Sequence, residues 1–151
     1  MILYLDSSAI VKLYIEETGS PLVHKLVNNT EVIATSIIAF AELIATFSRL
    51  LQEKALTRNN YRQLVNDFKV DWESYLKLEI TESLIKIAGD LTEIHLLSGF
   101  DAIHLSSCIT LSRRVSDTVT FACWDNILWN AAKKEKFNIA PEKINHLFKT
   151  Y

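Results

Sequence analysis

Met1-Ile-Leu-Tyr-Leu-Asp6-Ser-Ser8 opens the chain, and in it a short apolar run ends abruptly in a carboxylate and two hydroxyls. Ile2 to Leu5 is apolar without alternation, which is typical of a strand buried on both faces of a parallel sheet. Asp6 then stands at the carboxyl end of that strand, the edge of an α/β sheet where ligands bind. The alternative is that Asp6, Ser7 or Ser8 caps the next helix, and by itself Asp6 fits a cap better than a catalytic role.

Strand and helix patterns alternate along the rest of the chain. Strands are predicted at 2–5, 31–35, 76–80, 119–123 and 137–140. The third of these alternates polar and apolar residues, which favours a half-exposed edge strand. Helices are predicted at 8–17, 20–28, 38–54, 57–75, 81–97, 100–111 and 125–134. This order predicts an α/β fold with three layers, α/β/α, around a mainly parallel sheet.

Length and composition favour one globular domain over residues 1–151, because apolar residues make up 49% of the chain. No apolar run approaches a membrane span, and the start of the chain lacks the features of a signal peptide, so we expect a cytoplasmic protein without membrane association. Cys108 and Cys123 form no CxxC pair, which predicts buried thiols. The net charge of −2 gives no general attraction to nucleic acid, so RNA binding would depend on a local basic patch, metal ions or both.

Acidic side chains gather at the predicted carboxyl edge of the sheet. Asp6 and Asp125 follow strands and Glu42 lies near the start of a helix, whereas Asp101 follows a helix, so pattern alone does not place it there. Close carboxylates without a basic partner repel each other unless one takes up a proton or a cation lies between them. The aspartates begin helices, which favours their ionised form. Clustered oxygen ligands without His or Cys suit Mg²⁺ or Mn²⁺, which makes a metal-dependent phosphotransfer or hydrolase site one reading of these residues.

Four segments carry a further signal through their order and spacing. They are Tyr4-Leu-Asp6-Ser-Ser-Ala-Ile-Val-Lys-Leu-Tyr14, Ala41-Glu42, Asp101-Ala-Ile-His-Leu105 and Phe121-Ala-Cys-Trp-Asp125-Asn-Ile-Leu128. Together these segments resemble the successive motifs of PIN-domain ribonucleases, and in particular the VapC-type toxins of bacterial and archaeal toxin–antitoxin pairs. The resemblance covers essentially the whole chain, and the first and third segments are its most specific parts.

The resemblance implies both a site and a reaction. Asp6, Glu42 and Asp101 correspond to the core acidic metal ligands and Asp125 to the fourth acid, so catalytic and metal-binding roles fall on the same residues. Family members hydrolyse RNA phosphodiesters with Mg²⁺ or Mn²⁺ and leave a 5′-phosphate and a 3′-hydroxyl. A cognate VapB-type antitoxin and a homodimer are also implied. Cys123 departs from the pattern, because many relatives carry Ser or Thr there, and this puts a polar contact near the metal in doubt.

The main alternative function is a catalytically weak or silent PIN-like module that binds RNA or an antitoxin partner; the presence of all four acids argues against it. An aspartyl-nucleophile phosphatase would need a second Asp where Ser8 stands, and three glycines supply no phosphate-binding loop. His104 is expected to be a satisfied, partly buried side chain rather than a base. Lys12 and the pair Arg113-Arg114 are either contacts to RNA phosphates or simple surface charge.

Overall fold

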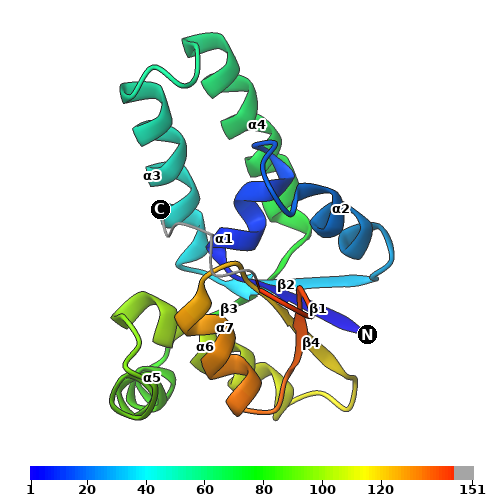
Figure 1. Ribbon diagram of the computed structural model, residues 1–151, viewed down its shortest axis with the longest axis vertical. Coiled ribbons are helices and arrows are strands. Elements are labelled where there is room, and N and C mark those ends of the chain that lie inside the picture. Colours follow the sequence, from blue (N-terminus) through cyan, green and yellow to red (C-terminus); the bar gives the residue numbers. More distant parts are fainter. Residues whose placement is uncertain (145–151) are drawn as a thin grey trace.

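A five-stranded sheet, parallel throughout, forms the centre of the computed structural model (Figure 1). The strands, in spatial order, are β3 (Leu76–Leu78), β2 (Val32–Ser36), β1 (Ile2–Leu5), β4 (Val119–Ala122) and β5 (Asn138–Ala140). The structure describes residues 1–144, so 145–151 of the expected single domain lie outside the described residues. The predicted parallel sheet is confirmed, with β1 at its centre and β3 at an edge.

Helices cover both faces of this sheet, which confirms the predicted three-layer α/β/α fold (Figure 1). On one face lie α1 (Ser7–Ile10), a 3₁₀ turn η1 (Val11–Leu13), α2 (Ser20–Asn28), α3 (Ala39–Gln52) and α4 (Arg58–Ser74). On the other face lie α5 (Glu82–His95), α6 (Gly99–Ser112) and α7 (Asn126–Lys134).

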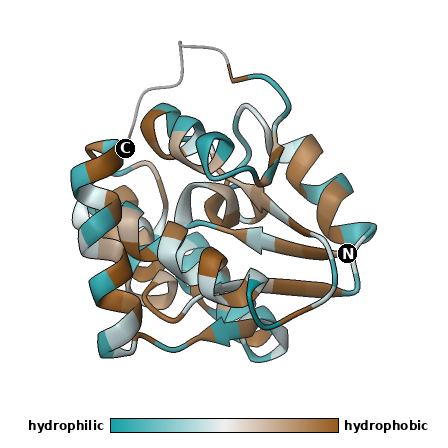
Figure 2. Cartoon of the chain, turned by 90° about the horizontal axis from the view of Figure 1, so that it is seen from below, coloured by the Kyte–Doolittle hydropathy of each residue, from teal (hydrophilic) through white to brown (hydrophobic). Residues whose placement is uncertain are grey.

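Strand β1 divides the apolar core into two halves. Ile2 and Tyr4 pack among α5, α6 and α7, whereas Leu3 and Leu5 pack among the helices of the opposite face. All four residues are buried, and brown, the hydrophobic colour, predominates in the central strands (Figure 2). The unbroken apolar run is therefore a strand buried on both faces, as predicted. Its successive side chains point to opposite faces of the sheet, and helices cover both faces.

The order of the strands explains where a ligand site forms. The chain builds β1, β2 and β3 outward in one direction and then returns to place β4 on the other side of β1. In open parallel sheets the crevice at the carboxyl ends of the strands lies at such a reversal. The hydroxyl of Thr35 donates to the carbonyl of Leu5 at 2.7 Å and ties β2 to β1 at this edge.

The first helix is much shorter than predicted. It was expected over 8–17, but α1 and η1 end at Leu13. The hydroxyl of Ser20 accepts a hydrogen bond from the amide of Glu17 and donates one to the carbonyl of Ile15, so this segment closes as a loop. With its hydroxyl used in this way, Ser20 does not cap α2, and Gly19 takes the N-cap position instead, in a left-handed conformation with φ of 98°.

Helix α6 is the most buried of the described helices, as its nearly uniform apolar sequence predicted. Cys108 on this helix and Cys123 after β4 are buried free thiols, which confirms the expectation for both cysteines. Among residues 1–144, no single helix combines the length and apolar character needed to cross a membrane, although α5 and α6, bent by 117°, meet those criteria as a pair.

We expect Gly19→Ala to destabilise the protein by at least about 1–2 kcal/mol, because a left-handed backbone is costly for residues with a Cβ. The added Cβ would also lie 2.5 Å from Nε1 of Trp124. Gly89→Ala is the matched control: Gly89 lies within α5 with nothing within 4 Å of its added Cβ, so this change should stabilise by about 0.5–1 kcal/mol. Urea unfolding measures both, and equal effects of the two substitutions would contradict the prediction.

Candidate metal-binding active site

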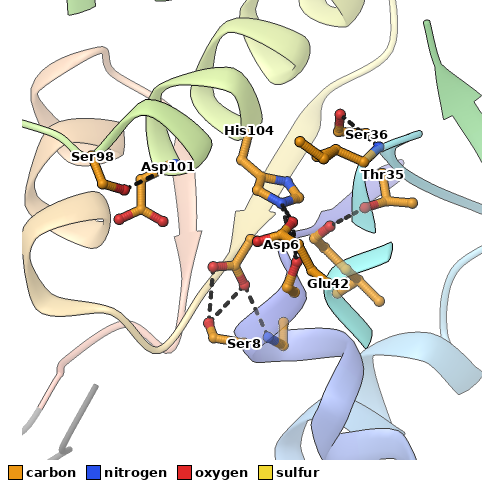
Figure 3. Close-up of polar contacts among 12 residues, drawn as sticks. Asp6, Ser8, Thr35, Ser36, Glu42, Ser98, Asp101 and His104 are labelled. Carbon is orange, nitrogen blue, oxygen red and sulfur yellow. Dashed lines mark hydrogen bonds and ion pairs between the residues drawn. The ribbon is translucent and has the colours of Figure 1, made fainter. Parts of the chain in front are cut away.

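Asp6 is both a helix cap and part of a cleft, so the two readings of its position in the sequence do not exclude each other. It follows β1, and its Oδ1 accepts a hydrogen bond from the amide of Ala9 at 2.9 Å, which caps α1. The hydroxyl of Ser8 donates to the same carboxylate at 2.7 Å (Figure 3). The side chain is almost fully buried, with 3% exposed. The carboxylate is therefore held in one orientation at the carboxyl end of the central strand.

Asp125 repeats this arrangement on the neighbouring strand. It follows β4 and caps α7, because its Oδ1 accepts a hydrogen bond from the amide of Leu128 at 2.9 Å. The amide of Trp124 donates to the hydroxyl of Ser8 at 2.8 Å and thereby joins the turns after β1 and β4. Cys123 offers only a long contact of 3.9 Å from its sulfur to the carbonyl oxygen of Asp125.

Tertiary structure places Asp101, which the sequence pattern left unplaced. Ser98 caps α6 by accepting a hydrogen bond from the amide of Asp101 at 3.3 Å, so the aspartate lies in the first turn of that helix. Helix α6 approaches the carboxyl edge from the face opposite to α1 and α3 (Figures 1 and 3). Three aspartates on three different helix N-termini thus meet the end of β1.

Glu42 differs from the aspartates because it has a basic partner, and the expectation that none of the four acids has one is wrong for this residue. Its Oε1 lies 2.6 Å from Nε2 of His104 and accepts a hydrogen bond of 2.6 Å from the hydroxyl of Ser7. The other ring nitrogen of His104 lies 3.0 Å from the hydroxyl of Tyr4. His104 is therefore satisfied, as predicted, but it is fully buried rather than partly buried, with 1% exposed.

One cleft of about 800 Å³ is lined by all four predicted site residues, and we call it the acidic cleft. Its lining includes Asp6, Glu42, Asp101 and Asp125, the small side chains of the turn after β1, His104, the cations Lys12 and Arg49, and the exposed apolar residues Phe100 and Ile127. The structure brings the four acids to one cleft, where sequence pattern placed Asp6, Glu42 and Asp125 and only the family resemblance implied Asp101. The hydrogen bond between Tyr4 and His104 was not predicted, because nothing in the sequence links residues 100 positions apart.

The electrostatics separate the acids into two kinds. Burial raises the pKa of Asp6 to about 7, and the nearby charge of Asp101 adds to that rise. Burial also raises the pKa of Asp101, with the charge of Asp125 as the second cause. For Glu42, the hydrogen bond and charge of His104 outweigh burial and lower the pKa. The same contact raises the pKa of His104 against the opposing effect of its burial. At Glu42 the contact with His104 outweighs burial, whereas at Asp6 and Asp101 burial outweighs the pKa-lowering effect of the same His104.

The donor set fits a hard divalent cation in kind, because the four acids offer carboxylate oxygens. Within residues 1–144, no three His, Cys, Asp or Glu side chains converge closely enough to hold an ion directly. Mg²⁺ commonly keeps several waters and takes only one or two carboxylates, so direct convergence of three is not required. The pKa values of Asp6 and Asp101 are raised first by burial and then by the charge of neighbouring acids, and a cation would favour the ionised form of both carboxylates.

We expect Asp6→Asn to stabilise the metal-free protein at about pH 8. The pKa of Asp6 is about 7 in the folded protein against 3.8 ordinarily, so stability from this group is full below about pH 4 and is lost as pH rises through 7. Asparagine avoids the buried charge and keeps the oxygen that caps Ala9, so the gain is on the order of 2 kcal/mol. Urea unfolding with chelator, near pH 4 and pH 8, measures the difference; equal stabilities at pH 8 would contradict it.

Comparison with known proteins gives matches in sequence and in structure. The family model for the PIN domain matches residues 3–116. Ribonuclease VapC45 of Mycobacterium tuberculosis is 28% identical over 144 residues, which cover 95% of this chain and 98% of that protein. A toxin–antitoxin complex from Klebsiella pneumoniae matches with a TM-score of 0.59 at 13% identity, covering 82% of this chain and 86% of the other. Mycobacterium tuberculosis VapC20, described as a sarcin–ricin loop cleaving toxin, matches with a TM-score of 0.62 at 16% identity, covering 85% and 94%.

Because the sequence identities to the two solved structures are only 13% and 16%, these matches show a shared fold and nothing more. The family match carries more, because it spans most of the chain and contains Asp6, Glu42 and Asp101. It ends before Asp125, which the structure adds to the same cleft. On the extent of that match, the chain belongs to the PIN-domain family and is a homologue of the VapC ribonuclease toxins of toxin–antitoxin systems.

Proposed function

We propose that this protein is an Mg²⁺- or Mn²⁺-dependent endoribonuclease. The observation that carries the proposal is the meeting of four acids in one cleft, two of them with raised pKa values. Ribonuclease activity is named for the relative VapC45, and RNA cleavage for the structural neighbour VapC20. The substrate class follows from this kinship, and the metal dependence follows from the chemistry of the cleft.

Asp6, Glu42, Asp101 and Asp125 would hold the metal, directly or through water. A bound hard cation supplies Lewis-acid stabilisation of the phosphodiester and lowers the pKa of water. The chain's own contribution is to hold the oxygen donors in place. The amides of Ala9 and Leu128 orient the carboxylates of Asp6 and Asp125, and His104 with Ser7 orients the carboxylate of Glu42.

The proposal extends to products, partners and location. Hydrolysis leaves a 5′-phosphate and a 3′-hydroxyl, and the protein is a toxin held inactive by a VapB-type antitoxin. The complex from Klebsiella pneumoniae supports a partner of this kind, and so do the exposed apolar side chains of Phe100 and Ile127 at the cleft. A homodimer and a cytoplasmic location, where the RNA substrate lies, complete the proposal.

A catalytically weak or silent module that binds RNA or an antitoxin is the second candidate. The observation that favours it is the absence, among the described residues, of three donors that converge on one point. The nuclease should cleave RNA and the binding module should cleave it weakly or not at all, so a direct cleavage assay separates the two candidates.

We expect the purified protein to cut a total RNA pool at discrete positions with Mn²⁺ or Mg²⁺ and not with chelator, leaving 5′-phosphate ends. Asp6→Asn and Asp101→Asn should each lower the rate about 100-fold or more, since even outer-shell changes at metal sites cost 10–100-fold. Asp117→Asn is the matched control, because Asp117 is exposed, precedes β4 and does not line the cleft. Mapping of the new RNA ends reads out the result.

Two outcomes of this assay would count against the nuclease. If folded protein free of antitoxin cuts no RNA with either metal, the binding-module candidate replaces it. If Asp117→Asn lowers cleavage as much as Asp6→Asn, the acidic cleft is not the catalytic site.

Metal binding should also be visible without any RNA. We expect Mn²⁺ to raise the melting temperature of the wild-type protein and to have little effect on Asp101→Asn. The increase should shrink as the pH falls from about 8 to about 6, because protons compete with the metal for Asp6, whose pKa is about 7. Differential scanning fluorimetry against Mn²⁺ concentration measures this, and an increase of equal size in the variant would contradict metal binding in the cleft.

A further inference from the structure

The sequence left two roles open for Lys12, a contact to an RNA phosphate or simple surface charge, and the structure bears on this choice. It lines the acidic cleft with only 6% exposed, so it is not simple surface charge. Arg113 and Arg114, the other basic residues considered for RNA contact, lie at the far end of α6, roughly 18 Å along the helix from Asp101. They do not line the cleft. Of these candidates, only Lys12 stands beside the proposed catalytic acids.

Two contacts hold the ammonium group of Lys12. Its Nζ lies 2.7 Å from Oε1 of Glu17 and 5.2 Å from the centre of the Trp124 ring. Glu17 also lines the cleft, and 19% of its side chain is exposed. The cation therefore rests on an aromatic face and meets a carboxylate that is open to the cleft.

The surroundings of Lys12 are tied to the acid cluster. The amide of Trp124 donates to the hydroxyl of Ser8, which in turn donates to the carboxylate of Asp6. On the other side, the loop that carries Glu17 packs against the Trp124 ring, where a Cβ on Gly19 would collide with it. The cation thus has a set position relative to Asp6.

The ion pair between Lys12 and Glu17 is not well explained by a contribution to the stability of the fold. Removing a lysine and a glutamate from water costs free energy that their mutual attraction often only balances, and apolar residues in their place are often as stable. The cleft holds four further acids, so a strand of RNA entering it would meet mostly negative charge. A cation placed among those acids has a direct use in binding a phosphate.

We propose that Lys12 binds a backbone phosphate of the RNA strand next to the acid cluster, and that Glu17 occupies the place of that phosphate until RNA displaces it. The carboxylate of Glu17 and a phosphate oxygen are both anionic acceptors for the same ammonium donor. The backbone of Glu17 is held through the hydroxyl of Ser20, so only its side chain has to move. This assignment rests on the proposed nuclease function and adds a substrate-binding residue to it.

The test is binding of a fluorescein-labelled single-stranded RNA, followed by anisotropy in Ca²⁺ at increasing KCl concentration. Lys12→Gln should weaken binding about tenfold, the value of one charged hydrogen bond. It should also lower the slope of log K against log salt by about 0.7, the contribution of one phosphate contact on a single strand. Lys12→Arg should keep the binding, and Glu17→Gln should strengthen it severalfold, because the competing carboxylate is gone.

Lys133→Gln is the matched control for the loss of a lysine that lies over a tryptophan. Lys133 sits 5.1 Å from the centre of the Trp129 ring, outside the acidic cleft, and its replacement should leave RNA binding and the salt slope unchanged. A structural role for Lys12 alone would lower stability in Lys12→Gln without any strengthening in Glu17→Gln. If Lys12→Gln does not fold, the unchanged RNA binding expected for Lys12→Arg and the stronger RNA binding expected for Glu17→Gln still decide the matter.

The proposal is overturned if Glu17→Gln binds RNA no better than wild type, or if Lys12→Gln and Lys133→Gln have equal effects. Failure of the nuclease function is distinguishable, because it shows as an absence of metal-dependent RNA cleavage by the wild-type protein. Wild-type cleavage together with unchanged RNA binding in Lys12→Gln would refute the role of Lys12 and leave the nuclease intact.

Discussion

Helix N-termini stabilise the acidic cluster, and the rest of the site depends on this interaction. Asp6 caps α1, Asp125 caps α7, and Asp101 lies in the first turn of α6. Each carboxylate lies near free backbone amides and the positive end of a helix dipole, which offset part of the cost of burying negative charge. The hydrogen bonds that begin α1 and α7 also orient the carboxylates of Asp6 and Asp125, so at these two positions fold and site are built by the same contacts.

The compensation is incomplete, and this shapes what the cleft can do. Asp6 and Asp101 keep raised pKa values because burial and neighbouring acids outweigh their hydrogen bonds. Glu42 is the exception, since buried His104 pairs with it and Tyr4 supports the ring. The metal-free cleft therefore stores unfavourable charge, a cost in stability that functional sites commonly carry. On the proposed function, an RNA strand would meet the same negative charge, so its binding would depend on local cations and not on the net charge of the chain.

The sequence by itself determined the layered fold and most of the strand positions. The apolar run of β1 has no alternation because both faces are covered, and the alternation near β3 marks an edge strand, so burial leaves a local trace in each. Asp6 and Asp125 were predictable for a related reason, since each ends a strand of a parallel sheet. Local hydrogen bonds decided where helices end. The first helix was expected to reach residue 17, but the hydroxyl of Ser20 bonds to the backbone of Ile15 and Glu17 and closes a loop there.

Only the tertiary structure decided the rest of the site. Asp101 follows a helix, and its arrival at the cleft depends on how α6 crosses the sheet. The partners of His104 lie 62 and 100 residues away, and Lys12 meets Glu17 because the chain turns after Leu13. Local pattern reports burial and periodicity along the chain, whereas contacts between distant segments follow from packing. The sequence therefore determined the places of Asp6 and Asp125 at the ends of strands, and the packing of α6 and of the loop before α2 determined that Asp101, His104 and Lys12 join them in one cleft.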